Sequence, residues 1–152
     1  MLHDFVLRGK KVKIWQRVGE SYEHILMKAL AFALFIDEYP DLQIETSVNL
    51  RFKPDLIVWD GDREFQLWVE CGANSLRKTA WILKHTQTKK LVLLKIGQNS
   101  EQLVKQLREI IPAKNRQTER LILINFVTSI ADLTVSKQIE KVSSNWYSKT
   151  IV

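Results

Sequence analysis

The chain has 152 residues, 45% hydrophobic and 26% charged, a composition typical of a globular domain and not of a disordered chain. Its net charge of +6 and pI near 9.5 favour polyanionic partners such as nucleic acid or anionic lipid. No apolar run is long enough to span a membrane, no secretory signal is expected, and the lone Cys71 cannot form an internal disulfide, so we expect a cytoplasmic protein.

The first third of the chain predicts a strand or hairpin followed by a buried helix. Partial alternation over residues 3–17 indicates the strand or hairpin. Ser21 is a suitable N-cap for a helix over about 21–38, which must end before Pro40 because proline cannot continue it. The helix is apolar on nearly every side, so we expect it at the centre of the core.

Three β-like runs follow the helix, each rich in β-branched and aromatic residues. The turn-forming segment Asp60–Gly61–Asp62 separates the second run from the third, and together the runs predict an antiparallel meander. A second helix is expected to start at Asn74 or Ser75 and to end near His85. The runs are residues 42–48, 52–60 and 64–71.

The second half of the chain alternates apolar strands with a helix. Strands are expected at 91–96 and 121–127, and Asn99 with Gln102 resembles a capping box that opens a helix ended by Pro112. This order predicts a parallel section of sheet covered on both faces, hence a mixed α/β fold. No repeat or linker divides residues 1–152, so one domain is expected; residues 128–152 carry no pattern that assigns them. The apolar face of the helix is expected to be formed by Leu103, Leu107, Ile110 and Ile111.

Two carboxylates lie within the apolar runs, where propensity does not favour them. Asp55 follows Pro54 and precedes three aliphatic residues, and Glu70 ends the next run. A buried carboxylate is costly unless a metal or another cation compensates it, so the pair is a candidate metal site. Alternatively, each carboxylate is solvated at a strand end or paired with one of the 23 basic side chains.

The strand register decides between these interpretations. A two-residue turn would place Asp55 opposite Gln66, leaving Glu70 roughly 13 Å further along, too far to share an ion. A four-residue loop over 61–64 would instead pair Asp60 with Phe65 and place Asp55 opposite Glu70, with side chains about 5 Å apart on one face. The sequence leaves both registers open.

Further charged residues lie near the expected helix starts. Arg77 and Lys78 occupy the first turn of the second helix, where they are either solvated or reach back to the carboxylates. Glu20 and Glu23 suit the start of the first helix and either one is also a candidate metal ligand. The isolated His24 is interpreted as structural or exposed, as is His85.

The spacing from Pro54-Asp55 to Glu70, with two strands and a helix around it, resembles the PD-(D/E)xK nuclease superfamily. Residues 19–34, 54–60 and 67–72 are similar to the YaeQ-type bacterial proteins, a divergent branch of that superfamily. The resemblance covers roughly residues 15–96 and implies a PD-(D/E)xK (restriction-endonuclease-like) core, a mixed sheet flanked by helices on both faces. The motif departs from the superfamily at Gly72, where a lysine is usual.

By this resemblance, Asp55 and Glu70 would hold Mg²⁺ or Mn²⁺. Lys78, with Arg77 as second choice, would replace the missing motif lysine, and Glu20 or Glu23 would be an accessory acid. The implied activity is metal-dependent hydrolysis of phosphodiester bonds, in DNA more than in RNA. A homodimer would suit the cutting of both strands of a duplex.

A second function is compatible with the same fold. The glycine at position 72 also suits an inactive nucleic-acid-binding or protein-interaction module that kept the architecture and lost the chemistry. Such a module would bind nucleic acid in a salt-dependent way, without regard to Mg²⁺ and without a requirement for Asp55.

Overall fold

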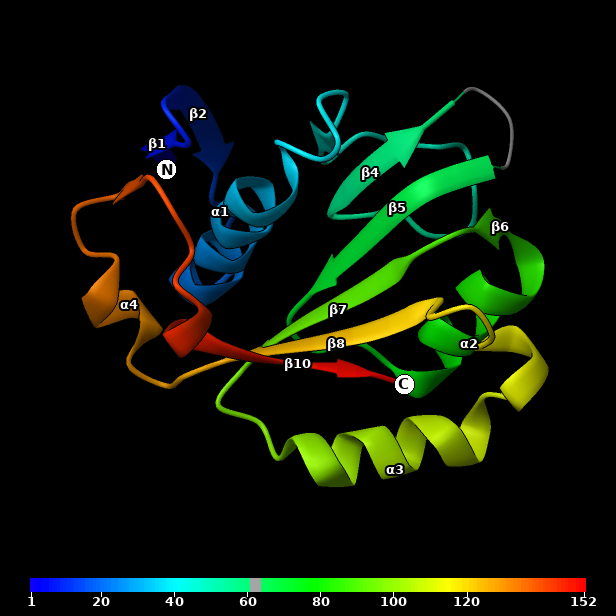
Figure 1. Ribbon diagram of the computed structural model, residues 1–152. Helices are drawn as coiled ribbons and strands as arrows, with labels where there is room; N and C mark the ends of the chain where they lie inside the picture. Colours follow the sequence, from blue (N-terminus) through cyan, green and yellow to red (C-terminus); the bar gives the residue numbers. More distant parts are fainter. Residues whose placement is uncertain (61–63) are drawn as a thin grey trace.

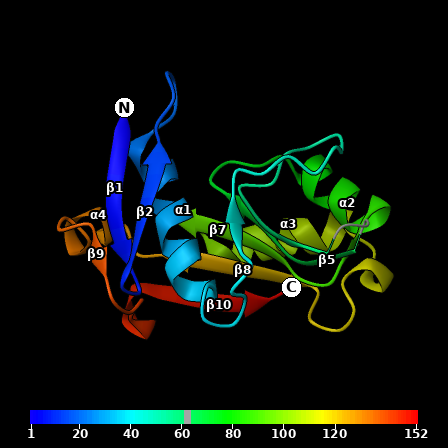
Figure 2. The same cartoon turned by 90° about the horizontal axis from the view of Figure 1, so that it is seen from above.

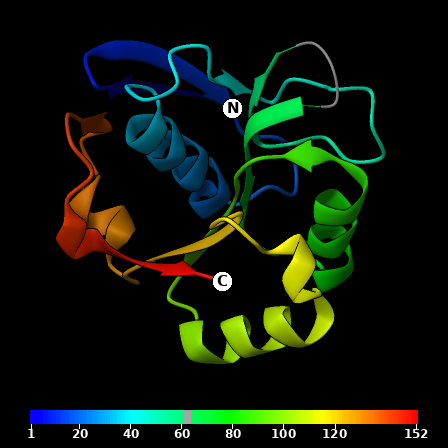
Figure 3. The same cartoon turned by 45° about the vertical axis from the view of Figure 1, so that its right-hand side comes forward.

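The computed structural model, which describes residues 1–60 and 64–152, has a mixed sheet with helices on both faces. Helix α1 (Tyr22–Phe35) covers one face, and α2 (Leu76–His85) and α3 (Ser100–Ile110) cover the other (Figures 1 and 3). The strand order is β10-β8-β7-β5-β4-β3, with β6 paired to β5. The strands are β3 (Gln43–Ile44), β4 (Leu56–Trp59), β5 (Glu64–Cys71), β6 (Gln87–Thr88), β7 (Leu91–Ile96), β8 (Leu121–Phe126) and β10 (Tyr147–Ile151).

The N-terminal residues form the hairpin that alternation over residues 3–17 allowed. Strands β1 (Leu2–Leu7) and β2 (Lys10–Trp15) pair antiparallel, and β9 (Gln138–Ile139) adds to β1 in parallel. Figure 2 shows this small sheet beside α1, away from α2 and α3. It closes the side of the core that α1 leaves uncovered, since Phe5, Leu7 and Ile139 are buried with the α1 residues.

Helix α1 is the central buried helix that the sequence predicted. The Ser21 side chain caps it by accepting a hydrogen bond from the His24 backbone N–H at 3.1 Å. Residues 25–33 are buried without interruption, because the sheet lies on one side of the helix and the small sheet on another. The helix ends at Phe35, three residues before the expected end at 38, and residues 36–38 form a turn before Pro40.

The meander is antiparallel as expected, but two of its strands are shorter than predicted. The run 42–48 contributes the two residues of β3, because Glu45 adopts a left-handed backbone (φ 55°) that takes the chain out of the sheet. The run 52–60 contributes only β4, which begins after Asp55, since Pro54 has no N–H to donate to a neighbouring strand. The third run, 64–71, is β5 over its full length.

The observed register is the one that opposes the two carboxylates. Leu56 pairs with Val69, so the preceding Asp55 comes opposite Glu70, and the register of a two-residue turn is wrong. A bulge between Val58 and Trp59 shifts the pairing by one residue near the loop, so that Trp59 and not Asp60 pairs with Phe65. The expected turn at Gly61 and Asp62, and the loop that includes Arg63, lie outside the described residues.

The parallel section predicted in the second half is confirmed. Strands β5, β7 and β8 are adjacent and parallel, connected through α2 and α3. Ser75 caps α2, and Asn99 caps α3 by accepting from the Gln102 backbone N–H. Val104, Leu107 and Ile111 are buried against the sheet, whereas Ile110 is 46% exposed, so its assignment to the apolar face was wrong.

The residues that the sequence did not assign complete the sheet edges. Strand β10 pairs antiparallel with β8, and β9 joins the N-terminal hairpin. Helix α4 (Ile130–Leu133) lies between β8 and β9, and a short 3₁₀ helix (Ser144–Trp146) lies between β9 and β10. Another 3₁₀ turn (Ala113–Asn115) follows α3. Within the described residues, no helix has the length and apolar character needed to cross a membrane.

Candidate functional site

The candidate site lies where the carboxyl ends of β5 and β7 meet the first turns of α1 and α2. Parallel strands followed by helices bring strand ends and helix N-termini to the same edge, which is where ligands commonly bind in such sheets. Asp55, immediately before β4, and Glu70, near the end of β5, reach this edge from adjacent strands.

Asp55 takes the place of a backbone acceptor at the end of the sheet. Its Oδ2 atom accepts a hydrogen bond from the Cys71 backbone N–H at 2.7 Å, while Oδ1 lies 3.5 Å from His24 Nε2. The side chain is 16% exposed. Asp55 is therefore tied to both α1 and β5, and one face of its carboxylate stays accessible.

Glu70 is buried and holds a partner on each oxygen. Oε1 accepts from Trp68 Nε1 at 2.9 Å and Oε2 from Lys78 Nζ at 3.0 Å. Burial, followed by the charge of Asp55, raises its pKa to about 7, although the bonds from Trp68 and Lys78 act in the opposite direction. A pKa raised in this way is typical of two neighbouring carboxylates whose repulsion is not fully compensated by nearby cations.

Of the two cations predicted at the start of α2, the structure brings one to the pair. Lys78 bonds Glu70 and its Nζ also lies 5.3 Å from the centre of the Phe52 ring. Arg77 is exposed and takes part in none of the ion pairs of the described residues. Glu23 is likewise exposed and is joined to neither carboxylate by a described bond.

Glu20 does approach Asp55, through His24, to which the sequence assigned no role in the site. His24 lies between them, with Nδ1 2.6 Å from Glu20 Oε2 and Nε2 directed at Asp55. Lys28 Nζ lies 2.8 Å from the same Glu20 oxygen and also bonds the Glu45 carboxylate. The spacing of four residues places His24 and Lys28 on one face of α1 and Glu20 just before its cap on the same side, a signal that was present in the sequence.

Electrostatics keep this cluster charged. Hydrogen bonding to Asp55 raises the pKa of His24 and outweighs the effect of burial. The imidazole therefore stays protonated to a higher pH than an ordinary histidine. Burial alone would lower the pKa of Lys28, but its bonds to Glu20 and Glu45 raise it. The pKa of Glu20 is lowered because its hydrogen bonds and neighbouring cations outweigh its burial. The earlier interpretation of His24 as a structural or exposed residue therefore overlooked its contacts.

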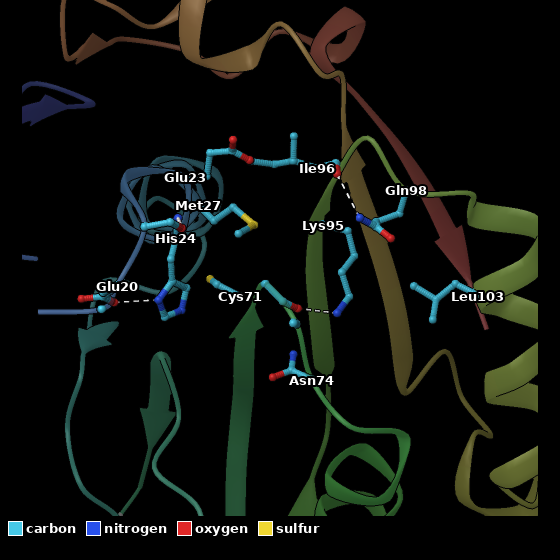
Figure 4. Close-up of a pocket in the computed structure, with 14 residues that line it drawn as sticks. Glu20, Glu23, His24, Met27, Cys71, Asn74, Lys95, Ile96, Gln98 and Leu103 are labelled. Atoms are coloured by element: carbon cyan, nitrogen blue, oxygen red, sulfur yellow. Dashed lines mark hydrogen bonds and ion pairs between the residues drawn. The ribbon is translucent and has the colours of Figure 1, made fainter. Parts of the chain in front are cut away.

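A cavity of about 600 Å³ adjoins these residues. Figure 4 shows Glu20, which precedes α1, and His24 of α1 on one side, Gln98 and Leu103 on the other, and Lys95 between them. The buried Cys71 lies in its wall, and burial raises the pKa of its thiol well above the usual range, so it is not a reactive thiolate.

The donor atoms suit a hard cation held by few protein ligands. Among residues 1–60 and 64–152, no group of three or more His, Cys, Asp and Glu side chains is arranged as metal ligands. Mg²⁺, however, is commonly held by one or two carboxylates and completes its shell with water and substrate phosphates. Asp55 and Glu70 fit that pattern, because their mutual repulsion would be relieved by a divalent ion between them.

Comparisons of the sequence and of the fold with known proteins both find YaeQ proteins. A family model described as "YaeQ protein" matches residues 8–143. Among solved structures, the YaeQ protein from Xanthomonas axonopodis pv. citri has a TM-score of 0.64 and 17% identity, covering 89% of this chain and 77% of its own. The YaeQ protein from Pseudomonas syringae has a TM-score of 0.61 and 16% identity, covering 97% and 86%. No curated protein matches the sequence.

Proposed function

The chain belongs to the YaeQ family, and from its carboxylate site we propose that it is a metal-dependent phosphodiesterase with a PD-(D/E)xK-type core, acting on DNA or RNA. The observation that carries the proposal is the strand register, which opposes Asp55 to Glu70 and brings Lys78 Nζ to 3.0 Å from the Glu70 carboxylate. Two carboxylates beside one cation are the groups that metal-assisted phosphodiester hydrolysis needs.

Asp55 and Glu70 would hold Mg²⁺ or Mn²⁺. Bound there, the ion would lower the pKa of a water molecule and neutralise charge on the phosphate. The Cys71 amide and His24 orient the Asp55 carboxylate, and Trp68 orients that of Glu70. The carboxylates are thus held in place before a substrate arrives, which reduces the cost of reorganisation.

Lys78 supplies the positive charge that the motif lacks at Gly72. Gly72 has φ of +81°, a left-handed backbone that disfavours any side chain, so a lysine at this position would be strained. Lys78 reaches the same carboxylate from α2. From there its ammonium can stabilise the charge that develops on a phosphate in the transition state.

The experiment that tests the proposal is metal-dependent cleavage of mixed DNA and RNA substrates. We expect Mg²⁺- or Mn²⁺-dependent cleavage by the wild type, and a loss of roughly 100-fold or more in folded Asp55→Asn and Glu70→Gln variants. Lys78→Met should lower the rate by a similar order and leave substrate binding largely intact. Arg77→Met is the matched control, since Arg77 lies next to Lys78 but makes no ion pair among the described residues.

A second function is favoured by the ion pair itself. Because Lys78 already neutralises part of the Glu70 charge, the site is also suited to a binding module without catalysis. That function predicts no cleavage by any variant, and DNA binding that neither Mg²⁺ nor Asp55→Asn changes. Cleavage that is lost with Asp55 would exclude it.

A further inference from the structure

The cavity near the carboxylates, which Asp55 and Glu70 themselves do not line, is bordered by residues at the starts of three helices. Glu20 precedes α1 and Glu23 lies in its first turn, Asn74 precedes the α2 cap Ser75, and Gln98 precedes the α3 cap Asn99. Each of these helices has 10 residues or more. Helix N-termini carry partial positive charge, so three of them around one cavity produce a potential that favours an anion.

An independent feature of the same cavity is the buried cation Lys95. Its side chain projects from β7 and is 9% exposed, and its Nζ donates to the Gly72 carbonyl oxygen. Among the described residues, no carboxylate lies within ion-pair distance of it. A buried ammonium normally requires a counter-charge, and Lys28, the other buried lysine of the site, has both Glu20 and Glu45.

A second donor near Lys95 lacks an acceptor. The Asn74 side-chain nitrogen is buried and has no hydrogen-bond partner among the described residues. Figure 4 shows this amide nitrogen turned toward Lys95 across the cavity wall. Buried donors are nearly always satisfied in folded proteins, so an unpaired amide next to an ammonium that has a backbone carbonyl but no carboxylate indicates a missing acceptor.

The acidic residues of the cavity do not provide that acceptor. Glu20 is engaged by Lys28 and His24 on the far side of the cavity, and Glu23 is exposed at its rim. Burial lowers the pKa of Lys95 and outweighs the opposing charges of Cys71 and Glu70, so the neighbouring acidic groups do not fully compensate the burial of the ammonium.

We propose that this cavity is a phosphate-binding subsite in which Lys95 and Asn74 bind the phosphate oxygens of a nucleic-acid strand. A phosphate has several acceptor oxygens and can accept from both donors at once. The volume of about 600 Å³ is sufficient for a nucleotide unit. The inference rests on the proposed function for the identity of the strand, and it adds a contact for a phosphate beside the one that is hydrolysed.

The test is phosphate binding by the full chain without metal, with a chelator present. Inorganic phosphate and the dinucleotide TpT are titrated while backbone amide shifts are followed by NMR. We expect the largest shifts around Gly72, Asn74 and Lys95, and competition between the two ligands. Lys95→Met should weaken both by roughly 10- to 100-fold, since it removes a charged hydrogen-bond donor and keeps the aliphatic stem.

Two further variants separate binding from structure. Lys105→Met, an exposed lysine of α3, is the matched control and should bind phosphate like the wild type. Asn74→Asp places a carboxylate beside Lys95, so it should raise the unfolding midpoint and abolish phosphate binding. A residue that only supports the fold would not change stability and binding in opposite directions.

Unchanged phosphate binding in Lys95→Met, or shifts confined to another surface, would overturn the inference. Failure of the proposed function is distinguishable, because it would show as absent cleavage while phosphate still binds at Lys95. Failure of the inference alone would show as cleavage that persists in Lys95→Met with unaltered phosphate affinity.

Discussion

At the scale of single residues, the site contains two glutamates whose surroundings shift their pKa values in opposite directions. Glu20 is surrounded by Lys28 and His24, and its pKa is lowered. Among the described residues, Glu70 has only Lys78 as an oppositely charged partner and lies beside Asp55, and its pKa is raised to about 7. The region around Glu70 is therefore where additional positive charge would stabilise the folded protein most.

This difference predicts how stability depends on pH. The folded state keeps a proton on Glu70 between about 4.5 and 7 that the unfolded state has lost, so without divalent metal stability should fall as pH rises through this window. The fall attributable to Glu70 is roughly 3 kcal/mol. We expect urea unfolding at pH 5 and pH 7.5 to show it in the wild type and not in Glu70→Gln.

The matched control for that prediction is Glu109→Gln, which changes an exposed glutamate of α3. It should keep the pH dependence of the wild type. An equal fall in the wild type and in Glu70→Gln would show that another group causes it.

At the scale of elements, turns with left-handed glycines set where strands end. Gly97 follows β7 with φ of +62°, and its N–H donates to the Phe126 carbonyl oxygen at 2.8 Å. A Cβ atom at this position would come within 2.4 Å of Thr128 Cγ2. The turn that leads into α3 therefore depends both on the backbone conformation and on the space that glycine leaves.

Gly97→Ala and Gly9→Ala separate these two contributions. Gly9 has a similar φ of +79° with no atom within 4 Å of an added Cβ, so Gly9→Ala should cost about 1 kcal/mol from the backbone alone. Gly97→Ala should cost more, and adding Thr128→Ser, which removes the clashing methyl group, should recover the difference. Chemical unfolding of the three variants measures this, and equal costs for both glycines would contradict the argument.

At the scale of the whole molecule, positive charge is spread over a chain whose candidate site lies at one edge of the sheet. The net charge is +6. The opposite end of β5 borders a second hollow of about 880 Å³ lined by Lys84, Lys89, Lys90 and Arg120. Arg120 is held there by backbone carbonyls of Thr86 and Thr88, whereas the lysines are exposed or partly exposed. Charge is thus available for a strand that extends beyond the carboxylates.

The nucleic-acid binding that we propose should accordingly depend steeply on salt. Between 50 and 200 mM salt we expect the affinity for a mixed-sequence DNA to fall roughly 10-fold or more, because neutralised phosphates release their counterions. Fluorescence anisotropy at several salt concentrations gives the slope. A peptide nucleic acid of the same sequence, which lacks phosphates, serves as the control, and an affinity for DNA that stays flat with salt would contradict the prediction.

Much of the fold was readable from local pattern. The α1 helix with its Ser21 cap, the full length of β5 and the parallel strands β7 and β8 followed from hydrophobic runs and capping residues. The position of each element along the chain depends on residues close in sequence, such as the Ser21 cap of α1 and, for α3, the Asn99 cap and the following Pro112. By itself the sequence also singled out Asp55 and Glu70, because carboxylates in apolar strands break the local rule, and Lys78 with Arg77, because cations in the first turn of a helix oppose its dipole.

Tertiary structure decided the features that depend on contacts between residues far apart in the sequence. The register that opposes Asp55 to Glu70 passes through a bulge that no local signal marks. The left-handed Glu45 shortened the first strand of the meander, and β9 and β10 joined sheets whose other strands lie far away in the sequence. Lys95 and Asn74 were not identified, since each belongs to an ordinary segment. They become unusual only where folding leaves the Lys95 ammonium without a carboxylate and the Asn74 amide nitrogen without an acceptor among the described residues.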